Sequence, residues 1–120
     1  MTNFGIVLID DLRSFKEDVD ATIIRTAAGS VEWLNTLSYN DTIESLWLDH
    51  DLGKDAQGQA TDIRDFVKTL EEMAYFNNSP VIDTVFVHTS NSVGSRYIIA
   101  ALEKYYNVEQ VYAGNHLIAL

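Results

Sequence analysis

The sequence predicts an α/β fold in which helices cover a parallel β-sheet. Short apolar runs rich in β-branched residues alternate along the chain with segments of helical periodicity. The first run, residues 4–9, is continuous, which is typical of a strand buried on both faces. Carboxylate, imidazole and hydroxyl side chains follow several of these runs directly. The chain has 120 residues, 47% of them apolar, and is expected to form a single domain over residues 1–120.

Five apolar segments are predicted to form strands. They cover residues 4–9, 22–26, 43–49, 84–87 and 108–112. Because helical segments separate most of them, right-handed crossovers should join the strands into a parallel sheet. Five such strands match the flavodoxin-like order 2-1-3-4-5, a three-layer arrangement.

Helices are expected at about 27–37, from an N-cap at Thr61 to a stop at 77–80, and at about 92–105. The middle helix has the clearest core-facing stripe, formed by Ile63, Phe66, Val67, Leu70, Met73 and Ala74. The remaining segments are interpreted as a loop or short helix (14–20), a loop over the carboxyl edge of the sheet (54–60) and a tail (113–120).

Composition narrows the classes of function. The net charge is −10, which opposes binding to duplex nucleic acid but leaves room for a small phosphate-containing ligand held locally. The absence of cysteine excludes disulfides, thiolate catalysis and Cys-ligated zinc. The apolar run 4–9 is too short for a signal peptide or a membrane span. A cytoplasmic protein without a membrane partner is therefore expected, and the sequence gives no indication of its oligomeric state.

Three polar clusters follow the first, third and fourth predicted strands. They are Asp10-Asp11, Asp49-His50-Asp51 and 88–91. In the predicted order these strands are neighbours, so the clusters should meet at the carboxyl edge. Adjacent carboxylates repel unless a cation neutralises them. The expected cofactor is thus a divalent metal, Mg²⁺ with Mn²⁺ possible, held by Asp10, Asp11, Asp49 and Asp51. The alternative for 49–53 is a solvated loop whose Asp residues cap the next helix; Gly53 would turn the backbone sharply.

These clusters resemble those of receiver domains, the phospho-acceptor modules of two-component signalling. An acidic pair (Asp10 and Asp11), an Asp that ends the third strand (Asp49) and a hydroxyl residue after the fourth (Thr89 or Ser90) occupy the matching positions. The resemblance implies magnesium binding by the acidic residues. Receivers also place a Lys at the end of the fifth strand, whereas this chain has no Lys or Arg after residue 104.

Three motifs are more similar to the cyclic-phosphate-processing receiver-like domains. These motifs are Leu12-Arg13, Leu48-Asp49-His50-Asp51-Leu52-Gly53 and His88-x-Ser90-Asn91-x-x-Gly94. In that family a Pro often occupies the positions of Ser14 and Ser92. The resemblance implies action on a cyclic phosphate, in nucleotide-signal or RNA-end contexts, by a metal-dependent phosphoesterase.

Roles follow for the individual residues. Asp49, assisted by Asp11, is a possible nucleophile, and His88 is a candidate general acid or base, since the pKa of an ordinary imidazole lies near neutrality. The phosphate would be bound by Arg13, His50, Ser90, Asn91 and Gly94, with Lys54 and Arg96 as weaker candidates.

Each of these roles has a structural alternative. His88 can be a core imidazole, Ser90 and Asn91 can be helix caps, and Arg13 can form a surface ion pair. Two other functions stay open for the whole chain. One is a signalling receiver that accepts phosphate on Asp49, and the other is a non-catalytic module that sequesters a cyclic nucleotide.

Overall fold

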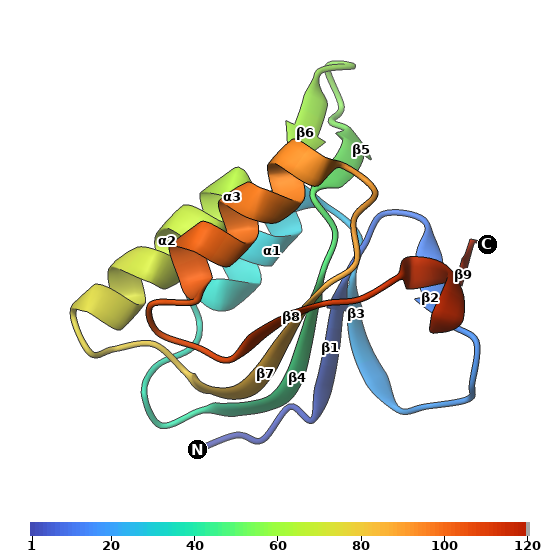
Figure 1. Cartoon of the computed structure of the whole chain (residues 1–120). Coiled ribbons are helices and arrows are strands. Elements are labelled where there is room, and N and C mark those ends of the chain that lie inside the picture. Colours follow the sequence, from blue (N-terminus) through green and yellow to red (C-terminus); the bar gives the residue numbers. More distant parts are fainter. Residues whose placement is uncertain (120) are drawn as a thin grey trace.

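The computed structural model describes residues 1–119 and contains a five-stranded parallel sheet (Figure 1). Across the sheet the strands lie in the order β3 (Ala21–Ile24), β1 (Ile6–Ile9), β4 (Thr42–Leu48), β7 (Val81–Val87) and β8 (Val108–Gln110). Every neighbouring pair in this sheet is parallel. Numbered by these five strands alone, the order is 2-1-3-4-5. The predicted flavodoxin-like α/β fold is confirmed.

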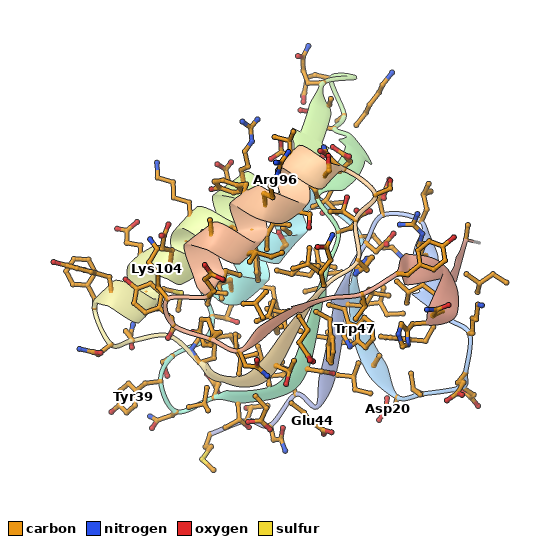
Figure 2. The ribbon with its side chains drawn as sticks, viewed as in Figure 1. Asp20, Tyr39, Glu44, Trp47, Arg96 and Lys104 are labelled. Atoms are coloured by element: carbon orange, nitrogen blue, oxygen red, sulfur yellow. The ribbon has the colours of Figure 1, made fainter. Side chains whose placement is uncertain are left out.

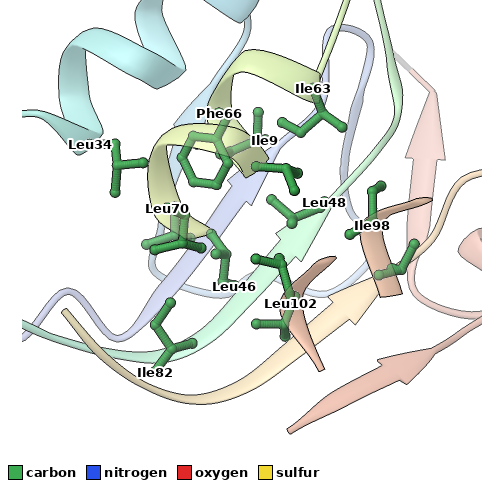
Figure 3. Packing of buried hydrophobic residues seen from close by; sticks show 14 of the residues in the cluster. Ile9, Leu34, Leu46, Leu48, Ile63, Phe66, Leu70, Ile82, Ile98 and Leu102 are labelled. Atoms are coloured by element: carbon green, nitrogen blue, oxygen red, sulfur yellow. The ribbon is translucent and has the colours of Figure 1, made fainter. Parts of the chain in front are cut away.

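Three helices pack side by side on one face of the sheet: α1 (Ala27–Leu34), α2 (Arg64–Tyr75) and α3 (Ser92–Leu102) (Figure 1). Their apolar faces and alternate strand residues form the main core (Figure 3). The first and last helices each end three residues before the predicted end. The predicted N-cap at Thr61 is wrong, because Ile63 holds that position and the Thr61 hydroxyl instead bonds the Gly53 carbonyl oxygen at 3.0 Å.

Thr61 lies in a hairpin that rises from the carboxyl edge of the sheet (Figure 1). Strands β5 (Asp51–Lys54) and β6 (Ala60–Asp62) pair antiparallel, and the predicted loop forms the turn between them. Gly53 has φ of +76°, and a Cβ added there would lie 2.9 Å from Oδ2 of Asp11. This glycine therefore lets β5 pass close to the Asp11 carboxylate, whereas a sharp turn was expected there.

The opposite face of the sheet is covered by a two-stranded ribbon in place of helices. Strand β2 (Arg13–Phe15) pairs antiparallel with β9 (Leu117–Ala119), which follows the short 3₁₀ helix η1 (Ala113–Asn115). Beneath the ribbon a second core is centred on Trp47, which stacks on Phe86 at 4.4 Å and meets Phe15 edge-on at 5.2 Å (Figure 2). The third layer of the fold is thus a β-ribbon.

This ribbon corrects the interpretations of two segments. Residues 14–20 were expected to form a loop or short helix and 113–120 a tail, but each contributes a strand. Leu120, the last residue of the predicted tail, lies outside the described residues. Among residues 1–119, no helix is long and apolar enough to cross a membrane.

Candidate functional site

Asp10, Asp49 and His88 form a row across three adjacent strands. The register of the sheet aligns the last residues of β1, β4 and β7, and each row residue is the next one along its strand. Because side chains alternate between faces along a strand, all three are on the face that carries Trp47, beneath the ribbon. Neighbouring strands lie about 4.8 Å apart. Asp10 and His88 follow strands on either side of β4, and their side chains meet across it, so that the ligating atoms of the row all lie within 4.8 Å of one another.

Asp10 is fully buried and accepts hydrogen bonds on both carboxylate oxygens. Its Oδ1 accepts the backbone N–H groups of Leu12 at 2.9 Å and Arg13 at 2.8 Å, and its Oδ2 accepts from Nε2 of His88 at 2.9 Å. Burial alone would raise the pKa of Asp10, but the bonds from His88 and from the two backbone amides lower it to about 2. Asp10 is therefore an anion at neutral pH, held in a fixed orientation.

Asp49 is shifted in the other direction. Burial and then the neighbouring Asp10 charge raise its pKa, although the backbone N–H of His50 donates to its Oδ1 at 2.8 Å and the Thr89 hydroxyl also bonds it. Of the two hydroxyl candidates, Thr89 is the buried one beside Asp49, while Ser90 is exposed. The row thus pairs a strongly acidic carboxyl with one that a nearby cation would help to ionise.

Arg13 supplies a positive charge to both carboxylates. Its Nη1 lies 3.4 Å from Oδ2 of Asp10 and 3.6 Å from Oδ2 of Asp49, and its side chain is 33% exposed. Arg13 begins β2, and pairing of β2 with β9 holds its backbone over the row. The positively charged guanidinium therefore covers two buried carboxylates.

Arg25 fixes the loop between β1 and β2, and sequence reasoning missed it. Its guanidinium donates to the backbone carbonyls of Asp10 (3.2 Å) and Arg13 and to the Ser14 hydroxyl (2.8 Å). The position of Arg25 in the sequence could have indicated this role. Arg25 directly follows β3, which is the neighbour of β1 in the predicted order, so its side chain is at the same edge.

His88 is enclosed, with its side chain fully shielded from solvent. Because Asp10 is ionised, Nε2 carries the proton and donates it to Asp10, while Nδ1 is buried without a partner among the described residues. This placement matches the structural alternative of a core imidazole. In this conformation His88 orients Asp10 and has no contact with solvent.

The remaining predicted residues form an outer group around β5 and α3. His50 Nδ1 lies 3.2 Å from Asp51 Oδ1, and Asn91 Nδ2 lies 3.4 Å from the other Asp51 oxygen. Asn91 also caps α3, because its Oδ1 accepts the Gly94 N–H at 2.9 Å. A Cβ on Gly94 would lie 2.4 Å from Cγ of His50, so this glycine makes room for the imidazole.

The structure brings together part of the predicted set of four metal-binding carboxylates. Asp10 and Asp49 lie in the row, but Asp11 faces Gly53 and Asp51 belongs to the outer group with 67% of its side chain exposed. His88 takes the third place in the row. The two weaker phosphate candidates, Lys54 on β5 and Arg96 on α3 (Figure 2), are exposed and stand outside the row.

Residues 6–104 match the protein family described as the cyclic-phosphate processing Receiver domain. The chain belongs to this family. The matched residues run from β1 to the end of α3 and include the whole row, Arg13 and the outer group, whereas β8 and β9 follow the match. Among curated proteins and among solved structures, no significant match was found.

The row of this receiver domain has the chemistry of a divalent cation site. Two buried carboxylates provide the hard oxygen ligands that Mg²⁺ and Mn²⁺ prefer. His88 is close enough to be a ligand, but its Nε2–H group donates a hydrogen bond to Asp10, so an oxygen-based site formed by Asp10 and Asp49 agrees better with the bonds present. The position between these carboxylates is the one that the Arg13 guanidinium faces.

Proposed function

We propose that this receiver domain binds a cyclic phosphate and hydrolyses one of its ring ester bonds with the help of a divalent cation, Mg²⁺ or Mn²⁺. One observation carries the proposal: two buried carboxylates and one guanidinium, from β1, β4 and β2, converge within 3.6 Å. Carboxylates alone would favour the binding of a cation, and a guanidinium alone would favour the binding of an anion. Their combination suits a metal-bound phosphate, and the family description supplies the cyclic phosphate.

Asp10 and Asp49 would hold the cation. When bound, it would polarise a phosphoryl oxygen and make a bound water easier to deprotonate. Asp10 is suited to binding, because its pKa of about 2 keeps it ionised and His88 keeps it oriented. The ligand would approach from the exposed side, where Arg13 and Ser90 lie.

Asp49 is the candidate base. Its 7% exposure makes it the more accessible acid of the row, whereas Asp10 is fully buried and bonded on both oxygens. In the hydrolysis, water loses one proton to Asp49 and its oxygen bonds to phosphorus. The ring P–O bond breaks, and the released ester oxygen takes up the proton that Asp49 accepted, which restores the carboxylate. The product is an open phosphomonoester.

Arg13 would contact the phosphate and balance its charge. Receivers use a Lys after the fifth strand for that contact, and this chain has none there. Arg13 reaches the row from the ribbon side and provides a guanidinium that can bond phosphate through two N–H groups.

The test is incubation with 3′,5′-cyclic mononucleotides, cyclic dinucleotides and 2′,3′-cyclic phosphates, each with Mg²⁺, Mn²⁺ or EDTA. We expect ring opening that requires metal and is lost in Asp49→Asn but kept in Asp83→Asn, an exposed position outside the site. Metal-independent turnover, or full activity of Asp49→Asn, would refute the proposal. Ligand binding without conversion would instead indicate a sequestering module.

A second candidate is phosphate acceptance on Asp49. The Thr89 hydroxyl beside Asp49 favours it, since receivers place a hydroxyl residue there. Stable labelling by acetyl phosphate in the wild type, lost in Asp49→Asn, would support this function over hydrolysis.

A further inference from the structure

We propose that Arg13 is an exchangeable internal cation, which occupies the carboxylate pair until a divalent ion binds and then transfers its guanidinium to the ligand phosphate. This inference rests on the cation site of the proposed function and adds a regulation to it. Metal and phosphate would then bind cooperatively, because each removes an obstacle to the other. Asp10 and Asp49 share the Arg13 guanidinium, whereas their other bonds are separate.

Besides the buried Thr89 hydroxyl, which bonds Asp49, the two acids are contacted by fixed groups and by Arg13. Asp10 Oδ1 accepts two backbone amides, and Asp10 Oδ2 accepts Nε2 of the enclosed His88. Asp49 Oδ1 accepts the His50 backbone amide. The Oδ2 atoms of both acids share one further contact, Nη1 of Arg13. A metal ion that takes these two oxygens must therefore displace Arg13, which would also repel it.

The Arg13 side chain is free to move while its backbone stays in place. Its contacts of 3.4 and 3.6 Å to the row are longer than the ~2.8 Å typical of charge-assisted hydrogen bonds. One third of the side chain is exposed. The backbone is held at its N–H by Asp10, at its carbonyl by Arg25 and through the pairing of β2 with β9. A displaced guanidinium would thus remain beside the row, where a metal-bound phosphate would be.

The metal-free state would bind phosphate weakly. An incoming phosphate would meet two carboxylates, and the guanidinium that could attract it is already shared with them. Once a divalent ion neutralises the acids, Arg13 becomes available to the phosphate. Because coupling between two ligands is reciprocal, phosphate must tighten the metal by the same factor by which metal tightens phosphate.

The experiment measures Mn²⁺ binding by calorimetry and by the loss of the free-ion electron paramagnetic resonance signal, with and without inorganic phosphate. In the wild type we expect phosphate to tighten Mn²⁺ binding by at least about fivefold, the lower end of common coupling. Arg13→Met should bind Mn²⁺ alone about tenfold more tightly, since the competing charge is gone. It should also lose most of the tightening by phosphate.

Two variants serve as controls. Arg13→Lys keeps the charge and should bind Mn²⁺ alone like the wild type. Arg64→Met removes the same charge from a side chain that is 66% exposed and paired with Asp62, so it should change neither measurement. Thermal unfolding of each variant establishes that it is folded, and the wild-type coupling tests the proposal without any substitution.

The outcomes separate this inference from the proposed function. Mn²⁺ binding that phosphate leaves unchanged in the wild type, or that Arg13→Met fails to strengthen, would overturn the exchange while leaving the cation site intact. Absence of Mn²⁺ binding in both proteins would overturn the cation site and the exchange together. Cooperative binding without any ring opening would support the exchange and refute the hydrolase.

Discussion

Gly94→Ala is expected to destabilise the protein because of the His50 ring. Gly94 lies in the first turn of α3, and a Cβ there would lie 2.4, 2.5 and 2.9 Å from three carbon atoms of His50. Ordinary contacts of this kind begin near 3.4 Å. The closest of the three contacts would therefore be 1.0 Å too short (3.4 minus 2.4). The ring cannot relieve it by rotating alone, since the Cβ atom of His50 is itself one of the three.

The magnitude follows from two opposing contributions. Overpacking a well-filled site costs about 1–3 kcal/mol, and a 1.0 Å overlap against a ring belongs in the upper half of that range. Alanine in a helix regains about 1 kcal/mol relative to glycine. The net loss should be about 1–2 kcal/mol, which lowers the Tm of a domain of this size by about 5 °C.

The assay is urea unfolding followed by the fluorescence of Trp33 and Trp47, in a double-mutant cycle with His50→Ala. In the His50→Ala background only the 2.9 Å contact remains, so the penalty for Gly94→Ala should become clearly smaller. Ala100→Gly, at an exposed position of the same helix, measures the intrinsic preference alone. An equal penalty for Gly94→Ala in both backgrounds would show that the close approach to His50 is not the cause.

Three further predictions concern the row and its support. The folded-state pKa of Asp10 is about 2, below its ordinary 3.8, so its ionised form should contribute about 2 kcal/mol of stability above pH 4, and this contribution is lost as pH falls toward 2. Urea unfolding at several pH values should therefore show that the free-energy cost of Asp10→Asn becomes smaller in acid. The exposed Asp83→Asn is the control. Asp49→Asn removes a charge whose ionisation burial and Asp10 oppose, so it should raise Tm at pH 7 by about 2–5 °C, and an unchanged or lower Tm would contradict this. Arg25→Met removes three hydrogen bonds and should lower the free energy of unfolding in urea by about 2 kcal/mol. A decrease below about 0.5 kcal/mol would show that the β1–β2 loop keeps its conformation without these bonds.

The sheet and the row could be predicted because both depend on local pattern and a simple register. Each central strand ends in an apolar run, and the residue after it is polar. Once the order 2-1-3-4-5 is assumed, Asp10, Asp49 and His88 must lie side by side, as they do. The contact between Asp10 and His88 spans 78 positions in the chain, yet it follows from counting along two strands.

The ribbon could not be predicted in the same way. Strands β2 and β9 have three residues each, too few to show alternation, and they pair across about a hundred positions. Their formation depends on the apolar surface around Trp47, which exists only after the sheet has formed. The structure separates Asp11 and Asp51 from the row for a related reason. Asp11 and Asp51 adjoin row residues in the sequence, but alternation and the β5 hairpin direct their side chains elsewhere.

The ribbon also explains why the site uses an arginine from the start of the chain. Its two strands place Arg13 over the row and Phe15 over Trp47, so one short strand closes both the acidic site and the apolar core below it. In the ribbon Arg13 pairs with Ala119, and Ala119 lies beyond the residues that match the family. The position of the guanidinium therefore depends on a strand near the carboxyl terminus as well as on the acids beneath it. Because β2 has no sheet neighbour other than β9 among the described residues, loosening of β9 would leave the Arg13 backbone to its bonds with Asp10 and Arg25.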